Sequence, residues 1–437
     1  MQKSSISYIL KLSIPIFFAN LAIPLVAIID TALMGNLGNL SYLTATSIAA
    51  NLFSMIFWSF GFLRMGTVGL ISQALGKGDY RELVYILMRN FFIAIIASIL
   101  IIISLPLLFN ILNSIFITSN ETKILIKDYV TIRVFSAPAE FSIYILVGFF
   151  LGIQKTFLSS ALIIINSTLN ILLSVYFVTK LDLDVKGVAL GTLLSMYITA
   201  ILFSIFTYYF FIKRFKIIPK LNFHAILKIK KIITLFNINF NIFLRTILLT
   251  FSFFWITYLS STLGEQYVAI NSILLQLIII SAFFLDAYAF STEGIVGYSI
   301  GRRSVKMFLT VVKNSITLSF ITGIILSFVL FLTAIEIINL ITDIEFLRFL
   351  AYKYLLWVIV IPPIASFCYQ LDGIFIGATQ TKEMRNAMII SVLIFVILSI
   401  YLTQELHNYG IWFSLILLMI LRASTLHFYF NNILKKF

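Results

Sequence analysis

Charged residues are scarce in this chain of 437 residues: Asp, Glu, Lys and Arg make up only 11% of it, and 61% of the residues are hydrophobic. The mean hydropathy is +1.07. A soluble globular domain carries roughly 25% charged residues. The composition therefore excludes an ordinary soluble domain and predicts a chain that lies in a lipid bilayer.

Cysteine and histidine are nearly absent. The single cysteine, Cys368, excludes an internal disulfide and a cysteine-based metal site. The three histidines are far apart and lack ligand spacing, so a zinc site is not expected. The sequence also lacks a Walker phosphate loop and a His-Glu-x-x-His motif. We therefore expect no cofactor, no ATP-driven pump and no enzyme.

Long apolar runs are abundant. The run FFIAIIASILIIISLPLLFNIL at 91–112 carries no charge and is long enough to cross roughly 30 Å of hydrocarbon as a helix. No alternating strand pattern runs through the chain. The sequence predicts an all-α polytopic membrane protein with twelve transmembrane helices near 9–33, 43–74, 83–109, 121–152, 157–179, 187–212, 232–261, 267–300, 305–334, 345–377, 384–403 and 409–431.

The net charge of +14 reflects where the basic residues lie. With both termini inside, 21 Lys and Arg fall on inner connections and their flanks, and 6 fall on outer ones. This bias follows the positive-inside rule, so we expect a multi-pass protein of the inner (plasma) membrane with cytoplasmic N- and C-termini. Topology accounts for the basic charge, and no nucleic-acid partner is expected.

The chain repeats itself at an offset of 225 residues. Thr67 pairs with Thr292, and Gly152 pairs with Gly377. The other pairs at this offset include Gly69 with Gly294, Tyr129 with Tyr354, Pro138 with Pro363 and Thr156 with Thr381. Because 225 residues span six helices, the halves share one orientation and form a parallel repeat. We expect an N-lobe at 1–212, a basic cytoplasmic linker at 213–231 and a C-lobe at 232–437.

Asp30 is an acid inside the first span. An Asp at the centre of a membrane helix costs roughly 2.5–3.5 kcal/mol on insertion scales, so it is seldom without a role. Such a carboxyl can exchange a proton for a cation, which is the chemistry of an ion-coupling site. Asn170 and Ser174 lie one turn apart on the fifth span, and Asn166 precedes them by one more turn. With Thr192 of the sixth span they are candidates for a polar pocket around Asp30. The alternative is a hydrogen-bonded carboxyl that only ties helices together.

Four more acids fall within spans. Asp286 and Glu293 are seven residues apart, hence on one face of the eighth helix, and Asp372 follows in the tenth. These three form a candidate C-lobe site for ion or substrate, with Arg245 as a group that would neutralise them. Glu140, beside a proline near a helix break, has no separate role that the sequence indicates.

Several segments together resemble the multidrug and toxic compound extrusion (MATE) transporters, in particular their DinF-like branch. They are LSIPIFFANLAIPLVAIIDTALMGNLG, GFLRMGTVGLISQALGKGD, FLRT at 243–246, LDAYAFSTEGIVGYSIGRR and LDGIFIGATQTKEMRN. The resemblance covers essentially the whole chain. It implies a bacterial, two-lobed, twelve-helix antiporter that alternates between inward-open and outward-open states. It also implies that cationic or amphipathic small molecules leave the cell as H⁺ or Na⁺ enters.

The resemblance also implies residue roles. Asp30 matches the ion-coupling carboxylate of the family, and Pro15 matches a proline that accompanies bending of the first helix. Relatives often have an Asp where this chain has Ser174, so the ion-coupling set is Asp30 with Asn170, Ser174 and Thr192. Loss of one negative charge weakens Na⁺ binding more than protonation, which favours H⁺ as the coupling ion and leaves Na⁺ at Asp30 as the only metal to consider. We expect a monomer, because one chain carries both repeats.

Three other functions are alternatives to an exporter. A lipid-linked oligosaccharide flippase of the same superfamily would be expected to have a more basic central cavity, whereas only Arg64, Arg133, Arg245 and Arg422 fall within spans. A lipid-modifying membrane enzyme would need His or carboxylate groups clustered at one membrane face. A scaffold role does not explain five acids within spans.

Overall fold

The computed structural model describes residues 4–115, 119–219 and 222–437, and these residues form helices joined by short connections. Within that part of the chain, twelve spans are long and apolar enough to cross a membrane. Large apolar side chains lie on their outer surfaces, among them Phe18, Leu100 and Leu340, which suits contact with lipid. The all-α class and the twelve expected spans are confirmed.

The chain divides into two compact units, Phe18–Phe236 and a second that joins Met1–Phe17 to Asn237–Phe437. We call the first the N-unit and the second the C-unit. The helix α1 (Ile6–Gly35) contributes its first turns to the C-unit and the rest to the N-unit. This division does not test the lobe boundaries expected at 212 and 231, which stay a prediction.

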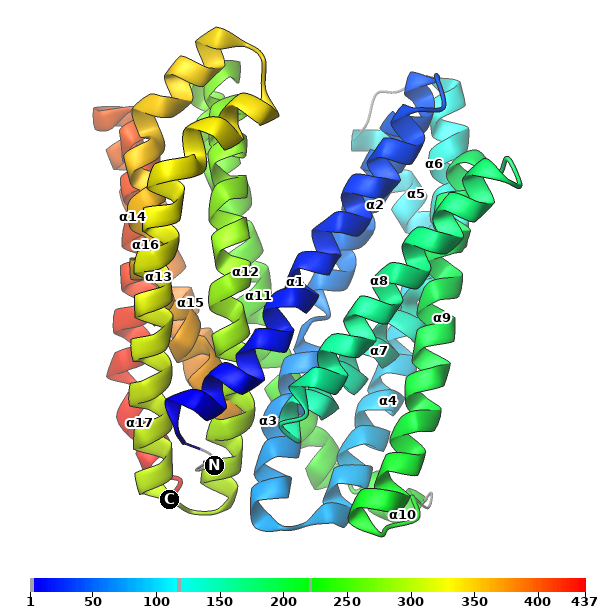
Figure 1. The fold of residues 1–437 in the computed structure, drawn as a ribbon, viewed down its shortest axis with the longest axis vertical. Coiled ribbons are helices and arrows are strands. Elements are labelled where there is room, and N and C mark those ends of the chain that lie inside the picture. Colours follow the sequence, from blue (N-terminus) through cyan, green and yellow to red (C-terminus); the bar gives the residue numbers. More distant parts are fainter. Residues whose placement is uncertain (1–3, 116–118, 220–221) are drawn as a thin grey trace. The chain divides into compact units, whose positions relative to one another are not determined.

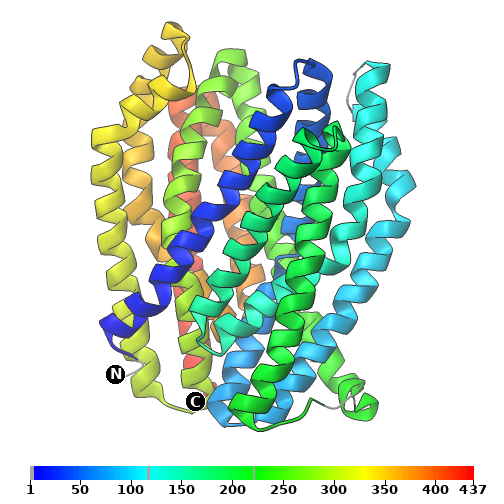
Figure 2. The ribbon, with the colours of Figure 1, turned by 45° about the vertical axis from the view of Figure 1, so that its right-hand side comes forward.

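The N-unit is built around α7, which packs against four of its neighbours. In both Figure 1 and Figure 2, α8 and α9 run side by side. The elements after α1 are α2 (Leu40–Ser59), α3 (Phe62–Lys77), α4 (Tyr80–Ile103), α5 (Leu105–Ile115), α6 (Asn120–Arg133), the 3₁₀ turn η1 (Val134–Ser136), α7 (Ala137–Gly152), α8 (Thr156–Thr179), α9 (Asp184–Phe210), the π-helical turn η2 (Phe211–Phe215) and α10 (Phe223–Ile226).

The C-unit is built around α14, which packs against α12, α13 and α16 (Figure 1). Its helices are α11 (Ile229–Leu263), whose first turns belong to the N-unit, α12 (Glu265–Gly301), α13 (Val305–Ile341), α14 (Glu345–Gly377), α15 (Thr381–Leu406), α16 (Asn408–Phe428) and α17 (Phe430–Leu434).

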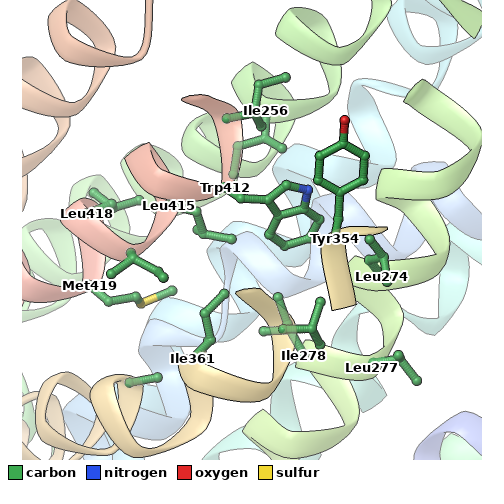
Figure 3. Close-up of a cluster of buried hydrophobic side chains, with 14 of the residues drawn as sticks. Ile256, Leu274, Leu277, Ile278, Tyr354, Ile361, Trp412, Leu415, Leu418 and Met419 are labelled. Atoms are coloured by element: carbon green, nitrogen blue, oxygen red, sulfur yellow. The ribbon is translucent and has the colours of Figure 1, made fainter. Parts of the chain in front are cut away.

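The interior of the C-unit is apolar. Trp412 and Tyr354 are buried among aliphatic side chains from α11, α12 and α14 (Figure 3). Trp412 turns its one polar atom, Nε1, to Asn271 Oδ1 at 3.0 Å. The indole is therefore buried without an unmet donor, as burial of a polar group requires.

Glycines show the internal repeat at atomic detail. A Cβ on Gly148 of α7 would lie 2.6 Å from the Arg64 carbonyl oxygen, and one on Gly373 of α14 would lie 2.7 Å from that of Ala289. The corresponding residues of the two contacts are 225 positions apart, Gly148 with Gly373 and Arg64 with Ala289. One turn later, Gly152 and Gly377 make equivalent close contacts with α3 and α12. The two G-x-x-x-G stretches thus let paired helices approach at matching places in the two halves.

Three predicted spans of the N-unit are broken helices. The span expected at 83–109 is α4 followed by α5, with Ser104 between them. The span expected at 43–74 is α2 followed by α3, with Phe60 and Gly61 between them. The span expected at 121–152 is α6 and α7 joined by η1, just before Pro138. Hydropathy alone did not indicate these breaks, because each of these spans still contains a stretch of 18 residues apolar enough to cross a membrane.

Candidate functional site

Asp30 lies on α1 within the N-unit and is half-buried. Its nearest polar partner is the Ser174 hydroxyl of α8, and the Arg133 guanidinium of α6 acts on it electrostatically. Its Oδ1 is buried and accepts no hydrogen bond from any described residue. We call this atom the open oxygen of Asp30. It is a place where a proton or a cation would gain a partner.

The three other residues predicted for the ion site lie together on α8 and α9. Asn170 Nδ2 donates to Thr192 Oγ1 at 3.1 Å, and Ser174 Oγ donates to Asn170 Oδ1 at 3.4 Å. All three side chains are buried. Gly191 of α9 makes this possible, because a Cβ there would meet the Ser174 backbone N at 2.7 Å. The structure brings the four predicted residues into one polar group.

Sequence reasoning missed Arg133 as a member of this site. It ends α6 and is buried, and its Nη2 donates to Glu140 Oε2 at 2.9 Å. Its Nη1 donates to the Ser136 hydroxyl in η1. Tyr144 closes the cluster by donating its hydroxyl to Glu140 Oε1 at 3.1 Å. The available signal was an arginine inside a span two helical turns before Glu140.

Aromatic rings enclose the guanidinium of Arg133. Its Cζ lies 4.7 Å from the ring centroid of Phe57 and 5.5 Å from that of Phe53. Phe141 of α7 packs against Phe57 edge-on at 5.8 Å and stacks on Phe60 at 4.6 Å. The α2–α3 and α6–α7 breaks therefore both lie at this cluster, and cation–π contact stabilises the charge that it encloses.

The buried acid of the C-unit, Asp372, has different partners from those of Asp30. Asp372 Oδ2 accepts from Arg422 Nη2 at 2.6 Å and also from Arg245 Nη2. All three side chains are buried, and they line a small pocket with Met384 and Met388. Arg422 comes from α16, fifty residues after Asp372. No local sequence signal links the two, which is why this partner was missed.

The other predicted residues of the C-unit lie on α12. Glu293 is buried and Asp286 is half-buried. Asp286 acts electrostatically on Tyr369 and Cys368 of α14. The charge of Asp286 therefore lies near the Asp372 cluster. Glu293 packs against Gly377 of α14 through its backbone carbonyl.

Pro15 lies inside α1, two residues before the helix passes from the C-unit to the N-unit. The first turns of α1 are held by Ser13, whose hydroxyl lies 2.9 Å from that of Ser291, and by Phe17, whose ring lies edge-on to Tyr288 at 5.2 Å. A bending role for Pro15 stays a prediction.

Gly297-Tyr-Ser-Ile-Gly301 has the spacing of a hydrolase nucleophile turn, but its serine, Ser299, is fully buried inside continuous α12 and donates to the Val296 carbonyl at 2.7 Å. The strand–turn–helix setting that exposes such a nucleophile is missing there. Among the described residues, no three His, Cys, Asp or Glu side chains group to hold a metal ion.

The comparisons agree on the family. The MatE family model matches residues 15–176 and 242–402. The DNA damage-inducible protein F of Escherichia coli (strain K12) is 31% identical over 428 residues, which cover 95% of this chain and 90% of that protein. The multidrug export protein MepA of Staphylococcus haemolyticus is 27% identical over 47% of this chain and 45% of that protein.

Solved structures show the same fold. A multidrug resistance MATE family transporter in an outward-facing conformation matches with a TM-score of 0.87 at 18% identity, covering 98% of this chain and 96% of that one. A MATE crystal structure in a straight conformation matches with the same TM-score at 19% identity and the same coverage. This chain belongs to the MatE family of membrane transporters.

Proposed function

We propose that this protein is a secondary active exporter that moves cationic or amphipathic small molecules out of the cell in exchange for H⁺ at Asp30. The observation that carries the proposal is the open oxygen of Asp30 among Asn170, Ser174 and Thr192. A proton needs only one oxygen lone pair, which this atom offers. The names of the relatives, such as multidrug export protein, support the class of cargo.

The N-unit and the C-unit have different roles in this proposal. Asp30 takes a proton from outside, which removes its negative charge and weakens its attraction for a bound cation. Release of the proton inside restores the charge for the next substrate. For exchange to result, proton and substrate must favour different states or compete for Asp30. The Asp372 carboxylate is held by two guanidinium groups and has a structural role in this proposal.

The energy is sufficient without ATP. A membrane potential supplies about 2.3 kcal/mol per charge per 100 mV, and a pH gradient adds about 1.4 kcal/mol per unit. One proton under such a gradient therefore sustains at least a tenfold gradient of substrate. In the same proposal the protein is a monomer of the bacterial inner membrane with both termini in the cytoplasm.

The test is export of ethidium from proteoliposomes under an imposed pH gradient and, separately, an imposed Na⁺ gradient. We expect the pH gradient to drive export by the wild type and the Asp30→Asn variant to lose it. Asp343→Asn is the matched control, because Asp343 is fully exposed at the end of α13 and pairs only with Arg348 among the described residues.

Three results contradict the proposal. Export driven by Na⁺ at equal pH assigns Na⁺ as the coupling ion. Equal export by wild type and Asp30→Asn returns Asp30 to a structural role. Absence of ethidium export under either gradient, with flipping of a lipid-linked oligosaccharide instead, assigns the flippase function.

A further inference from the structure

A small cavity of the C-unit adjoins the ion pairs of Asp372. Its volume of about 10 Å³ is the space of roughly one water-sized sphere. The side chains that line it are all buried: Arg245, Asp372, Met384, Ala387, Met388, Arg422 and Leu426. The acids within spans led us to expect a C-lobe site for an ion or a substrate. This cavity, however, has one acid and two guanidinium groups on its wall.

The wall of the cavity carries more hydrogen-bond donors than acceptors. Arg245 is 7% exposed, and its Nε is buried without a hydrogen-bond partner among the described residues. Arg422 Nη1 lies 3.6 Å from Met419 Sδ, and a thioether is only a weak acceptor. The two guanidinium groups share one carboxylate oxygen, Asp372 Oδ2. Because a guanidinium only donates, an acceptor that enters the cavity would satisfy Arg245 Nε.

The charges on the wall favour an anion over a water molecule. Arg245 and Arg422 bring two permanent positive charges, and Asp372 brings one negative charge. The other lining residues are apolar, and an apolar environment strengthens electrostatic attraction. A water molecule has two hydrogens that need acceptors, whereas an anion needs donors only. Burial of an ion is costly unless it is paired and hydrogen-bonded, and the guanidinium groups provide both. Asp286 of α12, which acts electrostatically on Cys368, does not line the cavity.

We propose that this cavity binds a chloride ion between Arg245 and Arg422. Its volume selects a monatomic anion, because chloride is only slightly larger than a water molecule, whereas a phosphate or carboxylate group is too large. The ion connects α15, which supplies Met384, Ala387 and Met388, to the helices that Asp372 already joins, α11, α14 and α16. The inference goes beyond the proposed function, because no residue of the Asp30 site takes part.

The experiment measures equilibrium binding of radioactive chloride to the purified full-length protein in sodium gluconate buffer. We expect one saturable site per chain in the wild type. Arg245→Gln removes the surplus positive charge but leaves the ion pair of Asp372 with Arg422, so we expect the affinity for chloride to fall at least about tenfold. Lys382→Gln is the matched control, because it removes a positive charge from an exposed position of α15 outside the cavity. It should bind chloride as the wild type does.

A second variant tests the volume of the site. Ala387→Val keeps all three charges and places a larger side chain on the cavity wall. We expect it to weaken chloride binding at least about tenfold as well, because the cavity has room for only about one water-sized sphere. If Arg245→Gln does not fold, Ala387→Val decides the question.

Two results of the binding experiment overturn the inference. Absence of saturable chloride binding by the folded wild type means that the cavity holds a water molecule only. Unchanged binding by folded Arg245→Gln or folded Ala387→Val means that the chloride binds elsewhere on the chain. Crystals soaked in bromide locate the ion directly. An anomalous peak beside Arg245 supports the inference, and bromide peaks only at other positions contradict it.

Discussion

The two halves of the molecule share the same order of helices but differ in where those helices are broken. The broken span α2–α3 begins at Leu40 and the continuous helix α12 begins at Glu265, exactly one repeat later in the sequence. The broken span α6–α7 covers Asn120–Gly152, and continuous α14 covers Glu345–Gly377 at the same offset. A third break, at Ser104 between α4 and α5, corresponds to continuous α13 (Val305–Ile341). The N-unit therefore breaks three helices that the C-unit keeps whole, and the Arg133 cluster lies at two of these breaks.

In the C-unit, a neighbouring side chain bonds one of the carbonyls that the prolines of α14 leave without a helical donor. Pro363 inside α14 has no N–H, which leaves the carbonyl of Ile359 without its helical donor. Ser327 of α13 donates its hydroxyl to that carbonyl. The N-unit has Ile102 at the position equivalent to Ser327, and isoleucine has no donor to offer. At the equivalent proline, Pro138, the chain instead adopts η1 and starts a new helix.

The internal repeat does not extend to the charged residues of the two sites. One repeat away from Asp30, Arg133 and Glu140 stand Trp255, Val358 and Ala365, and the C-unit positions Asp372, Arg245 and Arg422 likewise correspond to Val147, Asn20 and Tyr197. The N-unit carboxylate has an open oxygen, whereas the C-unit carboxylate is held by two guanidinium groups. The duplicated fold thus carries one carboxylate with an open oxygen and one that joins α11, α14 and α16.

The largest effect that tests this comparison is on stability. Asp372→Asn leaves two buried guanidinium groups without their counter-charge, and we expect it to lower the free energy of unfolding by roughly 3–5 kcal/mol. Asp30→Asn should change it by no more than about 0.5 kcal/mol, because it removes no ion pair. Thermal denaturation of both variants in detergent measures the difference. Equal melting temperatures would show that the two carboxylates are not distinct in kind.

A smaller effect tests the cause of the helix breaks. Ser327→Ala leaves the Ile359 carbonyl of α14 unmet in the membrane interior, and we expect a loss of roughly 1–3 kcal/mol in the free energy of unfolding. Thr333→Ala on the same helix is the matched control, because that exposed hydroxyl bonds only its own helix, to Val329, among the described contacts. Thermal denaturation again gives the measurement. A loss no greater than that of the control means that Ser327 does not keep α14 continuous.

Much of the frame could be predicted from the sequence, because hydropathy and a constant offset depend on the chain alone. The offset identified the helices that correspond, and the close contacts of Gly148 and Gly373 confirm that correspondence. The grouping of Asn170, Ser174 and Thr192 also followed from helical spacing and adjacent spans.

The sequence indicated a helix break only beside Pro138, and it did not indicate the other breaks or the arginine partners. Pro138 follows an alanine and Pro363 follows a second proline, Pro362, yet the chain breaks at the first site and α14 stays continuous at the second. Arg422 meets Asp372 through tertiary packing of α14 and α16, which no local pattern encodes. The polar contacts of each half therefore depend on residues that are not repeated in the other half.

The smallest expected effect concerns two tyrosines that the repeat places at equivalent positions. The Tyr129 hydroxyl acts with Arg133 by hydrogen bonding and with Asp30 electrostatically, whereas Tyr354 lies in the apolar core, its ring 4.8 Å from that of Tyr409 (Figure 3). Tyr129→Phe removes a bond worth about 1 kcal/mol, so we expect proton-driven ethidium export to fall about fivefold with little change in melting temperature. Tyr354→Phe should leave the export rate unchanged, since its hydroxyl touches no group of the proposed ion site. Equal export by both variants would mean that Tyr129 does not help to set the charge balance at Asp30, and that the polar difference between the halves is confined to the carboxylates and their arginines.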